Sequence, residues 1–171
     1  AIPGSIGGAI VSNAGAYGRS IGEVLRKATV LCDGTTLREL SAHDLGLGYR
    51  TSIFKGRRRP LDAIVSVELE LRRSDADTLR DEVARIRAQR SATQPTEPSA
   101  GSVFKNPPGL AAGWLIEQVG LKGRQIGGAR ISDKHANFIV NLGQAKARDV
   151  LELLKRIQEE LPLELEWEVW P

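Results

Sequence analysis

The sequence predicts an α+β protein in which helices cover short antiparallel sheets. Two stretches, 64–71 and 163–170, alternate apolar and polar residues, which is the period of a strand with one buried face. Three others, 74–90, 111–119 and 147–161, repeat apolar residues at helical spacing. With 171 residues, 41% of them hydrophobic and 26% charged, the chain has room for one sizeable domain or two small ones.

The first third of the chain combines a glycine-rich opening with two strands. KATVLCDG at 27–34 is the first strand, and IVSVELEL at 64–71 is the second. Between them we expect two short helical turns and a loop punctuated by glycine, within 35–54. This part is therefore predicted to be α+β with antiparallel connections.

The middle of the chain contains the clearest helix start. Ser74 and Asp77 form a pair resembling a capping box, and Leu79, Val83 and Ile86 follow on one face of a helix over 74–90. Two prolines interrupt the pattern in the next stretch, 91–101, which predicts a linker or an ordered loop.

The last third is predicted to be helix, strand, helix and strand. A helix over 111–119 is stopped by Gly120, and ANFIVN at 136–141 is a strand. A helix over 147–161 ends before Pro162. The final strand, 163–170, would direct four apolar side chains to a core and three glutamates to the other side; these glutamates are Glu164, Glu166 and Glu168.

Composition excludes several classes of protein. No run approaches the roughly 20 apolar residues of a membrane-spanning helix, and no signal peptide precedes the first elements, so we expect a cytoplasmic protein. A single cysteine, Cys32, with only His43 and His135, argues against a disulfide and against a zinc site. The absence of methionine, together with the start inside a turn, predicts that the chain is a fragment.

The charge pattern favours a small anionic ligand over nucleic acid. The formal net charge is +3, and the one dense basic run is KGRRRP at 55–60. No aromatic stacking motif surrounds this run, so a solvated loop is favoured over a nucleic-acid patch. A mildly basic protein suits a ligand such as a nucleotide sugar.

Two glycine-containing stretches are candidates for binding or chemistry. GSIGG at 4–8 could cradle a phosphate with backbone N–H groups or form a tight structural turn, and the residues alone do not separate the two. GSVFKNPPG at 101–109 would place Ser102, Phe104 and Asn106 on one side if it is extended. Such a group could donate a proton and hold a substrate; the structural alternative is a capped loop before a helix.

Charged residues supply two further candidates. Tyr49 and Arg50 lie in the loop GLGYRTS, and a guanidinium suits a carboxylate or enolate, although a surface salt bridge is the commoner role of arginine. Glu168 shares its strand face with two other glutamates, which usually means a solvated surface. If this face closed a cleft, burial and like charge would raise the pKa of the carboxyl and make it a proton-handling group.

Several motifs together resemble the UDP-N-acetylenolpyruvoylglucosamine reductases, the MurB family of flavoenzymes in bacterial peptidoglycan synthesis. They occur in the family's order and cover nearly the whole chain: AIPGSIGGAIVSNAGAYG, YRTSIF, GSVFKNPPG, AGWLIEQVGLKG, IGGARISDKHANFIVN and LEWEV. The resemblance implies the remainder of an FAD-binding lobe of the vanillyl-alcohol-oxidase type over 1–74. It implies a substrate lobe over 75–162 and a terminal strand, 163–171, that returns Glu168 to the flavin.

The resemblance also implies a reaction, cofactors and site residues. NADPH reduces FAD, and hydride then passes to the enolpyruvyl double bond of a UDP-sugar, giving UDP-N-acetylmuramate. Ser102 matches the proton donor, and Arg50 and Glu168 match the pair that stabilises the intermediate. Substrate-binding positions are Tyr17, Lys105, Asn106 and His135. Cofactor-binding positions are Ile2, Pro3, Gly4, Ser5, Gly7, Gly8, Ala9, Asn13 and Gly15; no metal is expected.

The expected partners are the UDP-sugar and the N-terminal segment that the family carries before residue 1. We expect no nucleic acid and no membrane as a partner, and we expect the protein to be a monomer. We add the hypothesis that Lys105 helps the weakly acidic serine to donate its proton. The stretch from Arg50 to Ser102 is short, as in the subgroup without a mobile tyrosine loop. Trp170 departs from the basic residue usual there, which keeps Glu166 open as the functional carboxylate.

Two alternatives from other classes remain. One is another FAD oxidoreductase of the superfamily, which would be expected to lack GSVFKNP and SDKHANF. The other is an inactive module that only binds a nucleotide sugar, which would not need a proton donor.

Overall fold

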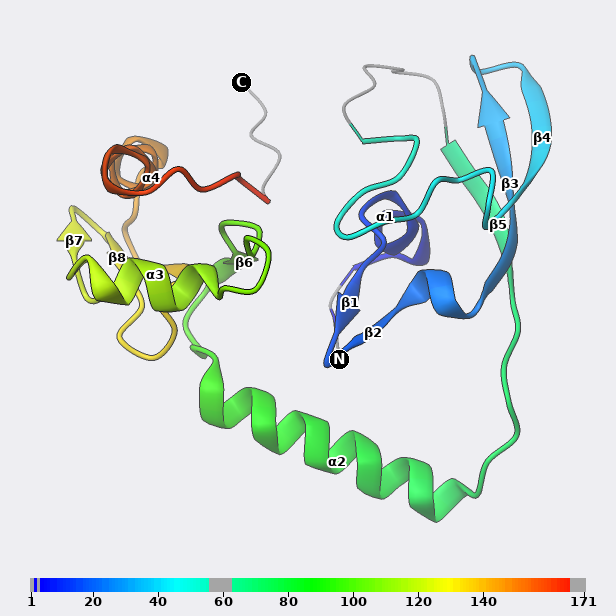
Figure 1. Ribbon diagram of the computed structural model, residues 1–171, viewed down its shortest axis with the longest axis horizontal. Coiled ribbons are helices and arrows are strands. Elements are labelled where there is room, and N and C mark those ends of the chain that lie inside the picture. The colour runs from blue at the N-terminus through cyan, green and yellow to red at the C-terminus, as the bar shows by residue number, and fades with distance from the viewer. Residues whose placement is uncertain (1, 3, 56–62, 167–171) are drawn as a thin grey trace. The chain divides into compact units, whose positions relative to one another are not determined.

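The computed structural model describes residues 2, 4–55 and 63–166 (Figure 1). The chain divides into two compact units, Ala1–Asp75 and Ala76–Pro171, and each is described here by itself. Within the described ranges, no helix is both long enough and apolar enough to cross a bilayer.

The first unit is built on an antiparallel sheet in the order β4-β3-β5. The strands are β3 (Leu25–Cys32), β4 (Thr36–Ser41) and β5 (Ala63–Leu69). Both strands predicted in this region are confirmed, and they pair with each other. The prediction of a helical turn after residue 35 is wrong, because Asp33 and Gly34 adopt positive φ angles of 51° and 71° in a tight turn that starts the hairpin strand β4.

Small residues allow the glycine-rich opening to pack onto this sheet. It forms α1 (Ile6–Val11), and a Cβ at Gly7 would lie 3.7 Å from the Cβ of Ile64 on β5. The hydroxyl of Ser5 accepts a hydrogen bond of 3.1 Å from the Gly8 N–H and so caps the helix. Ile10 is fully buried in the core of the unit, with Leu25, Ala28, Val30 and Leu45. Short elements follow: β1 (Gly15–Ala16), β2 (Arg19–Ser20) and η1 (Ile21–Glu23).

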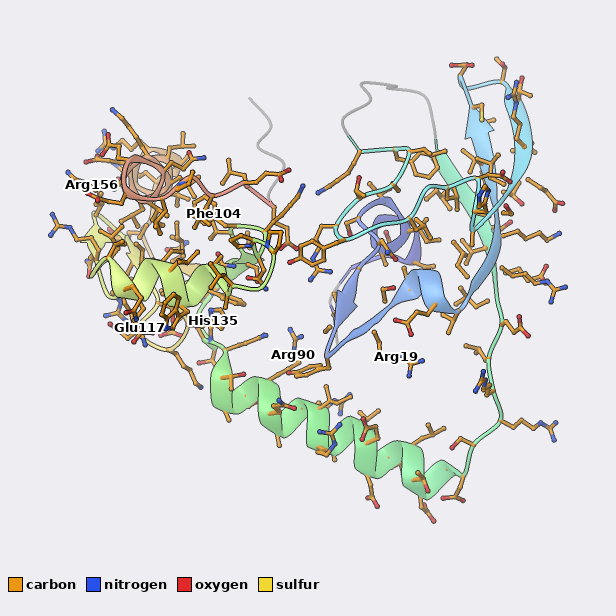
Figure 2. The ribbon with its side chains drawn as sticks, in the orientation of Figure 1. Arg19, Arg90, Phe104, Glu117, His135 and Arg156 are labelled. Atoms are coloured by element: carbon orange, nitrogen blue, oxygen red, sulfur yellow. The ribbon has the colours of Figure 1, made fainter. Side chains whose placement is uncertain are left out.

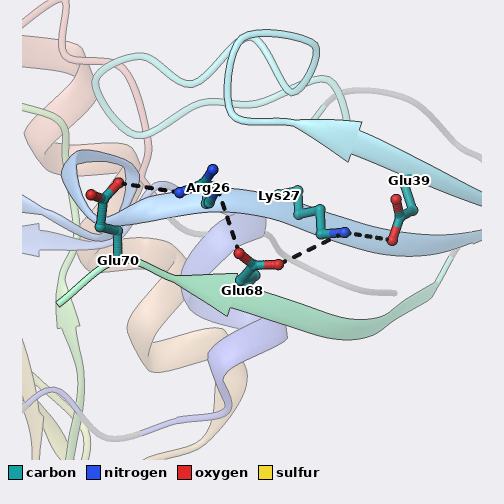
Figure 3. Close-up of polar contacts among 5 residues, drawn as sticks. All are labelled: Arg26, Lys27, Glu39, Glu68 and Glu70. Carbon is teal, nitrogen blue, oxygen red and sulfur yellow. Dashed lines mark hydrogen bonds and ion pairs between the residues drawn. The ribbon is translucent and has the colours of Figure 1, made fainter.

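Ion pairs tie the three strands together on the exposed side of the sheet (Figure 3). Lys27 of β3 lies 2.8 Å from Glu39 of β4 and 3.7 Å from Glu68 of β5. Arg26 lies 3.5 Å from the same Glu68, because the register of β3 and β5 shifts between Leu25 and Lys27. The carboxylate of Glu39, its hydrogen-bond partner, is the main reason that the pKa of Lys27 is raised.

The second unit has an antiparallel sheet in the order β6-β9-β8-β7. The predicted strand at 136–141 and the predicted helices at 111–119 and 147–161 are confirmed, within one or two residues at each end. The elements are β6 (Ser99–Ser102), α3 (Ala112–Gln118), β7 (Gln125–Ile126), β8 (Ala129–Ile131), β9 (Phe138–Asn141) and α4 (Ala147–Glu160).

The β7-β8 hairpin was not predicted, and two glycines account for it. Gly127 has a φ of +52°, and a Cβ at Gly128 would lie 2.4 Å from the backbone N of Ala145. The turn therefore needs glycine for its backbone conformation and for the close approach of the chain before α4.

The long helix α2 (Ala76–Thr93) confirms the predicted helix but not its buried face. The exposed fractions of Leu79 and Val83 are 51% and 45%, and no residue of α2, all of which the structure describes, is buried. The expected linker 91–101 is shorter than predicted, because α2 extends to Thr93 and β6 begins at Ser99. Ion pairs one turn apart, Asp77 with Arg80 and Glu82 with Arg85, support a solvated helix instead.

The end of the described chain joins the core of the second unit. Leu163 is 7% exposed, and Leu165 forms an isolated antiparallel bridge with Phe104. Residues 167–170 of the predicted final strand, which include Glu168 and Trp170, lie outside the described residues.

Candidate functional site

A groove of about 260 Å³ in the second unit brings together three of the predicted site residues. It is lined by Ser102, Asn106, Ala111, Gly113, Trp114, Glu117, Lys134, His135, Ala136 and Asn137. Figure 2 shows Glu117, on α3, close to His135. Ser102, Asn106 and His135 therefore share one surface, although 29 positions separate Asn106 from His135 in the sequence.

The segment after β6 provides the first wall of the groove. Ser102 ends β6, opposite Phe138 of β9, and is partly exposed. Ser102, Phe104 and Asn106 were expected to share one side of an extended segment, and for Phe104 this prediction is wrong. Its side chain (labelled in Figure 2) is 1% exposed and packs into the core, whereas Ser102 and Asn106 line the groove. Regular pairing of β6 stops at Ser102, so the period of two does not continue. Asn106 Oδ1 accepts a hydrogen bond of 3.0 Å from the N–H of Ala112, which ties this segment to α3.

His135 provides the opposite wall as a half-buried ring. Its Nδ1 accepts a hydrogen bond of 3.2 Å from the backbone N–H of Asn137, so the neutral ring carries its proton on Nε2. The ring meets Phe138 edge to face, with centroids 4.9 Å apart. Gly113 leaves space for it, because a Cβ there would lie 3.0 Å from His135 Cε1. Burial is the main cause that lowers the pKa of His135, and the charge of Lys122 acts in the same direction.

We expect His135 to remain neutral at pH values where an exposed histidine is already protonated. Its folded-state pKa is lowered, so its contribution to stability is complete above the unfolded pKa of about 6.5 and is lost as the pH falls through the folded value. NMR titration of the imidazole nitrogens measures this, with His43→Gln removing the signals of the other histidine. A midpoint for His135 at or above 6.5 would contradict the assigned environment.

Lys105, the fourth predicted site residue described in this unit, is not among the residues that line the groove, whereas two residues that were not predicted are. Lys105 forms an ion pair with Glu164, and its backbone N–H donates to the Glu164 carbonyl at 2.9 Å. To assist Ser102, the Lys105 ammonium would have to leave or share its ion pair with Glu164. The hypothesis that it does so stays a prediction. Trp114, 53% exposed, and Lys134 line the groove and were missed, because the only signal for them was their membership of the motifs AGWLIE and SDKHAN.

In the first unit, side chains fix the segment 48–52 along the segment 11–15. The Asn13 amide donates to the Gly48 carbonyl at 2.9 Å, Arg50 Nη2 donates to the Gly15 carbonyl at 3.0 Å, and the Ser52 hydroxyl donates to the Val11 carbonyl at 2.7 Å. These bonds hold Arg50 in a left-handed conformation with a φ of +53°. Its guanidinium lies 5.4 Å from the centroid of the Tyr49 ring. Tyr17, the remaining predicted substrate-binding residue, is 41% exposed.

The predicted cofactor-binding positions divide into two groups. Gly7, Asn13 and Gly15 have roles within the unit: Gly7 faces β5, Asn13 Oδ1 accepts from the Gly22 N–H at 3.0 Å, and a Cβ at Gly15 would lie 2.4 Å from the Arg19 carbonyl. The others form the outer surface of residues 2–9, with Ile2, Gly4, Ser5 and Gly8 exposed and Ala9 half-buried. Pro3 lies outside the described residues.

No group of three or more metal-ligating His, Cys, Asp or Glu side chains occurs in the described part of the chain. The candidate features are the groove in the second unit and, in the first unit, Arg50, which is held by its bond to the Gly15 carbonyl.

The chain is similar to known proteins over almost all of its length. Residues 94–170 match the family model described as UDP-N-acetylenolpyruvoylglucosamine reductase, C-terminal domain. A protein of that name from Thermus thermophilus is 46% identical over 99% of the chain and 62% of the relative. A second, from Symbiobacterium thermophilum and named UDP-N-acetylenolpyruvoylglucosamine reductase 2, is 45% identical over 99% of the chain and 56% of the relative.

A solved structure agrees with the sequence comparison. The crystal structure of UDP-N-acetylenolpyruvylglucosamine reductase (MurB) from Thermus caldophilus superposes with a TM-score of 0.90 and 46% identity, covering 99% of this chain and 62% of that one. The chain thus spans about six tenths of the length of these relatives. The predicted α+β fold, related to this reductase, is confirmed.

Proposed function

Because the chain belongs to the UDP-N-acetylenolpyruvoylglucosamine reductase family, we propose that the complete gene product reduces UDP-N-acetylglucosamine enolpyruvate to UDP-N-acetylmuramate. NADPH is the reductant and FAD the cofactor in this proposal, and the reaction makes a peptidoglycan precursor in the bacterial cytoplasm. The relatives named for this reaction are longer than the chain, so the activity is proposed for the whole protein and not for residues 1–171 alone.

The observation that carries the proposal is the composition of the groove in the second unit. A hydroxyl at Ser102, an amide at Asn106, a cation at Lys134 and a neutral imidazole N–H at His135 line one surface. A nucleotide sugar offers a diphosphate for the cation and the N–H donors. It also offers a reacting carbon that must receive a proton.

The chemistry assigns separate roles to Ser102 and Arg50. Hydride added to the terminal carbon of the enolpyruvyl double bond leaves an electron pair on the carbon next to the carboxylate. Ser102 gives its hydroxyl proton to that carbon, which completes the two-electron reduction. Arg50 stabilises the negative charge as it spreads into the carboxylate. Glu168 completes the proposed catalytic set by its resemblance to the family, with Glu166 as the alternative carboxylate.

The outer surface of residues 2–9 supports a cofactor role for the first unit. Ile2 and Ile6 are 50% and 51% exposed. Among the described residues, and apart from the chain neighbours of Gly4, no atom lies within 4 Å of a Cβ built on Gly4, so a flat apolar group can approach the backbone there. FAD, when bound, supplies the hydride that it has taken from NADPH. We propose that Ile2, Gly4, Ser5, Gly8 and Ala9 contact it, while Gly7, Asn13 and Gly15 hold this surface in place.

The test is a visible spectrum of the complete gene product, reduced anaerobically with NADPH and then mixed with UDP-N-acetylglucosamine enolpyruvate. Rapid return of oxidised flavin absorbance is expected. A bound flavin that NADPH reduces but this substrate leaves reduced would reject the proposed substrate and favour another oxidoreductase of the superfamily. A protein without flavin that still binds the nucleotide sugar would favour a binding module.

A further inference from the structure

Asn137 is a buried polar residue in the lining of the groove, and neither the sequence motifs nor the proposed reaction gives it a role. It is 3% exposed, between Ala136 and the first residue of β9, and it lies among apolar neighbours. Burying an amide lowers the stability of the fold unless its donors and acceptors form hydrogen bonds. Its partners therefore indicate what it does.

Both ends of the Asn137 amide bind one residue, Phe104. Oδ1 accepts from the Phe104 N–H at 2.9 Å, and Nδ2 donates to the Phe104 carbonyl at 2.8 Å. Because both bonds go to the backbone of Phe104, they fix the orientation of that backbone as well as its position. The backbone carbonyl of Asn137 accepts a third bond, 2.9 Å, from the Val103 N–H.

These three bonds hold the segment that starts at Ser102. Before Ser102 the chain passes through Gly101, whose φ is +82°, a conformation that glycine adopts without strain. After Ser102 come Val103 and Phe104, both at most 1% exposed. The backbone position of Ser102 is therefore set by its pairing with Phe138 and by the Asn137 bonds to the next two residues, Val103 and Phe104.

Asn137 also contacts the opposite wall of the groove, because its backbone N–H donates to His135 Nδ1 at 3.2 Å. One residue thus contacts both the serine segment and the histidine. Figure 2 labels its two partners, Phe104 and His135. We propose that Asn137 is a positioning residue, which holds the Ser102 hydroxyl where it can protonate the reduced substrate. This inference rests on the proposed function.

The test uses the complete gene product with Asn137→Leu, which keeps the branching at Cγ and removes both side-chain bonds, and Asn137→Asp, which keeps the acceptor for the Phe104 N–H. The two half-reactions are followed separately by flavin absorbance at neutral pH. We expect reoxidation by substrate to slow about 10- to 100-fold in Asn137→Leu, less in Asn137→Asp, and reduction by NADPH to stay within about twofold.

Two controls separate positioning from loss of stability. The bond from residue 137 to His135 comes from the backbone, so unchanged His135 imidazole signals report that this part of the unit remains folded. Asp149→Ala removes another buried group of the same unit, whose carboxylate accepts from the N–H groups of Lys146 and Gly128 at 3.0 and 3.2 Å. It does not line the groove, so it should lower Tm and leave both half-reactions unchanged.

Three outcomes would overturn the inference. Half-reaction rates within twofold of wild type in both Asn137 variants would remove the positioning role, and so would a slowing that Asp149→Ala shares. Loss of the folded state in both variants would assign Asn137 a purely structural role. Failure of the wild-type protein to reoxidise with substrate is distinguishable from these, because it rejects the proposed function before any variant is compared.

Discussion

Replacing Ser102 with alanine is expected to slow reoxidation of the reduced flavin by the enolpyruvyl substrate about 10²- to 10⁴-fold, the range of a positioned general acid. Ser102 lines the groove and its hydroxyl is the proposed source of the proton, whereas hydride transfer from NADPH to the flavin does not need it. Reduction by NADPH should therefore be unchanged. Stopped-flow absorbance of the two half-reactions in the complete gene product measures both rates.

The matched control is Ser99→Ala in the same strand. Ser99 is exposed, and its hydroxyl accepts a hydrogen bond of 3.4 Å from the Gly101 N–H, so the substitution changes β6 without changing the groove. Both half-reactions should run at wild-type rates in this variant. If Ser102→Ala also reoxidises within tenfold of wild type, the proton comes from another group or from water, and the assignment to Ser102 is wrong.

Patterns within a single element predicted most of this fold. The alternation in 64–71 gave β5, and the helical spacing in 147–161 gave α4, because each has one face in a core. Several short elements were missed, α1, β1, β2 and η1 among them; two others, β4 and the β7-β8 hairpin, depend on turns in which Gly34 and Gly127 have positive φ. The prediction that α2 has a buried face is wrong for a different reason. Its apolar residues have helical spacing, but no described residue of the second unit covers Leu79 or Val83 enough to bury them.

The candidate site was predicted less completely than the fold. Ser102, Asn106 and His135 were singled out by residue type and by resemblance, and their meeting in one groove depends on β6, α3 and the strand entry before β9. Asn137 could not be recognised from the sequence, since an asparagine next to an apolar strand is as compatible with a surface position as with a buried pair of hydrogen bonds. Only the structure shows that its amide pairs with Phe104, 33 positions earlier.

Substitution of Arg50 by lysine is expected to lower the rate of enolpyruvyl reduction about 10²- to 10³-fold, the usual cost of removing one donor aimed at a developing negative charge. The side chain keeps its positive charge, but it loses the planar fork that binds a carboxylate through two nitrogens. It also loses the bond of 3.0 Å to the Gly15 carbonyl, which fixes where the fork lies. Steady-state turnover with saturating NADPH, together with the half-reactions, measures the effect.

Lysine is the informative replacement because it isolates the geometry of the guanidinium. The backbone of residue 50 has a φ of +53°, and arginine and lysine tolerate this conformation equally, so the strain in the loop is the same in both proteins. Arg38→Lys on the exposed face of β4 repeats the chemical change in the same unit and should leave turnover at the wild-type rate. If Arg50→Lys keeps more than a tenth of wild-type turnover, a single positive charge is sufficient at this position. The bond to Gly15 and the held loop 48–52 would then serve the fold of the unit and not the stabilisation of the intermediate.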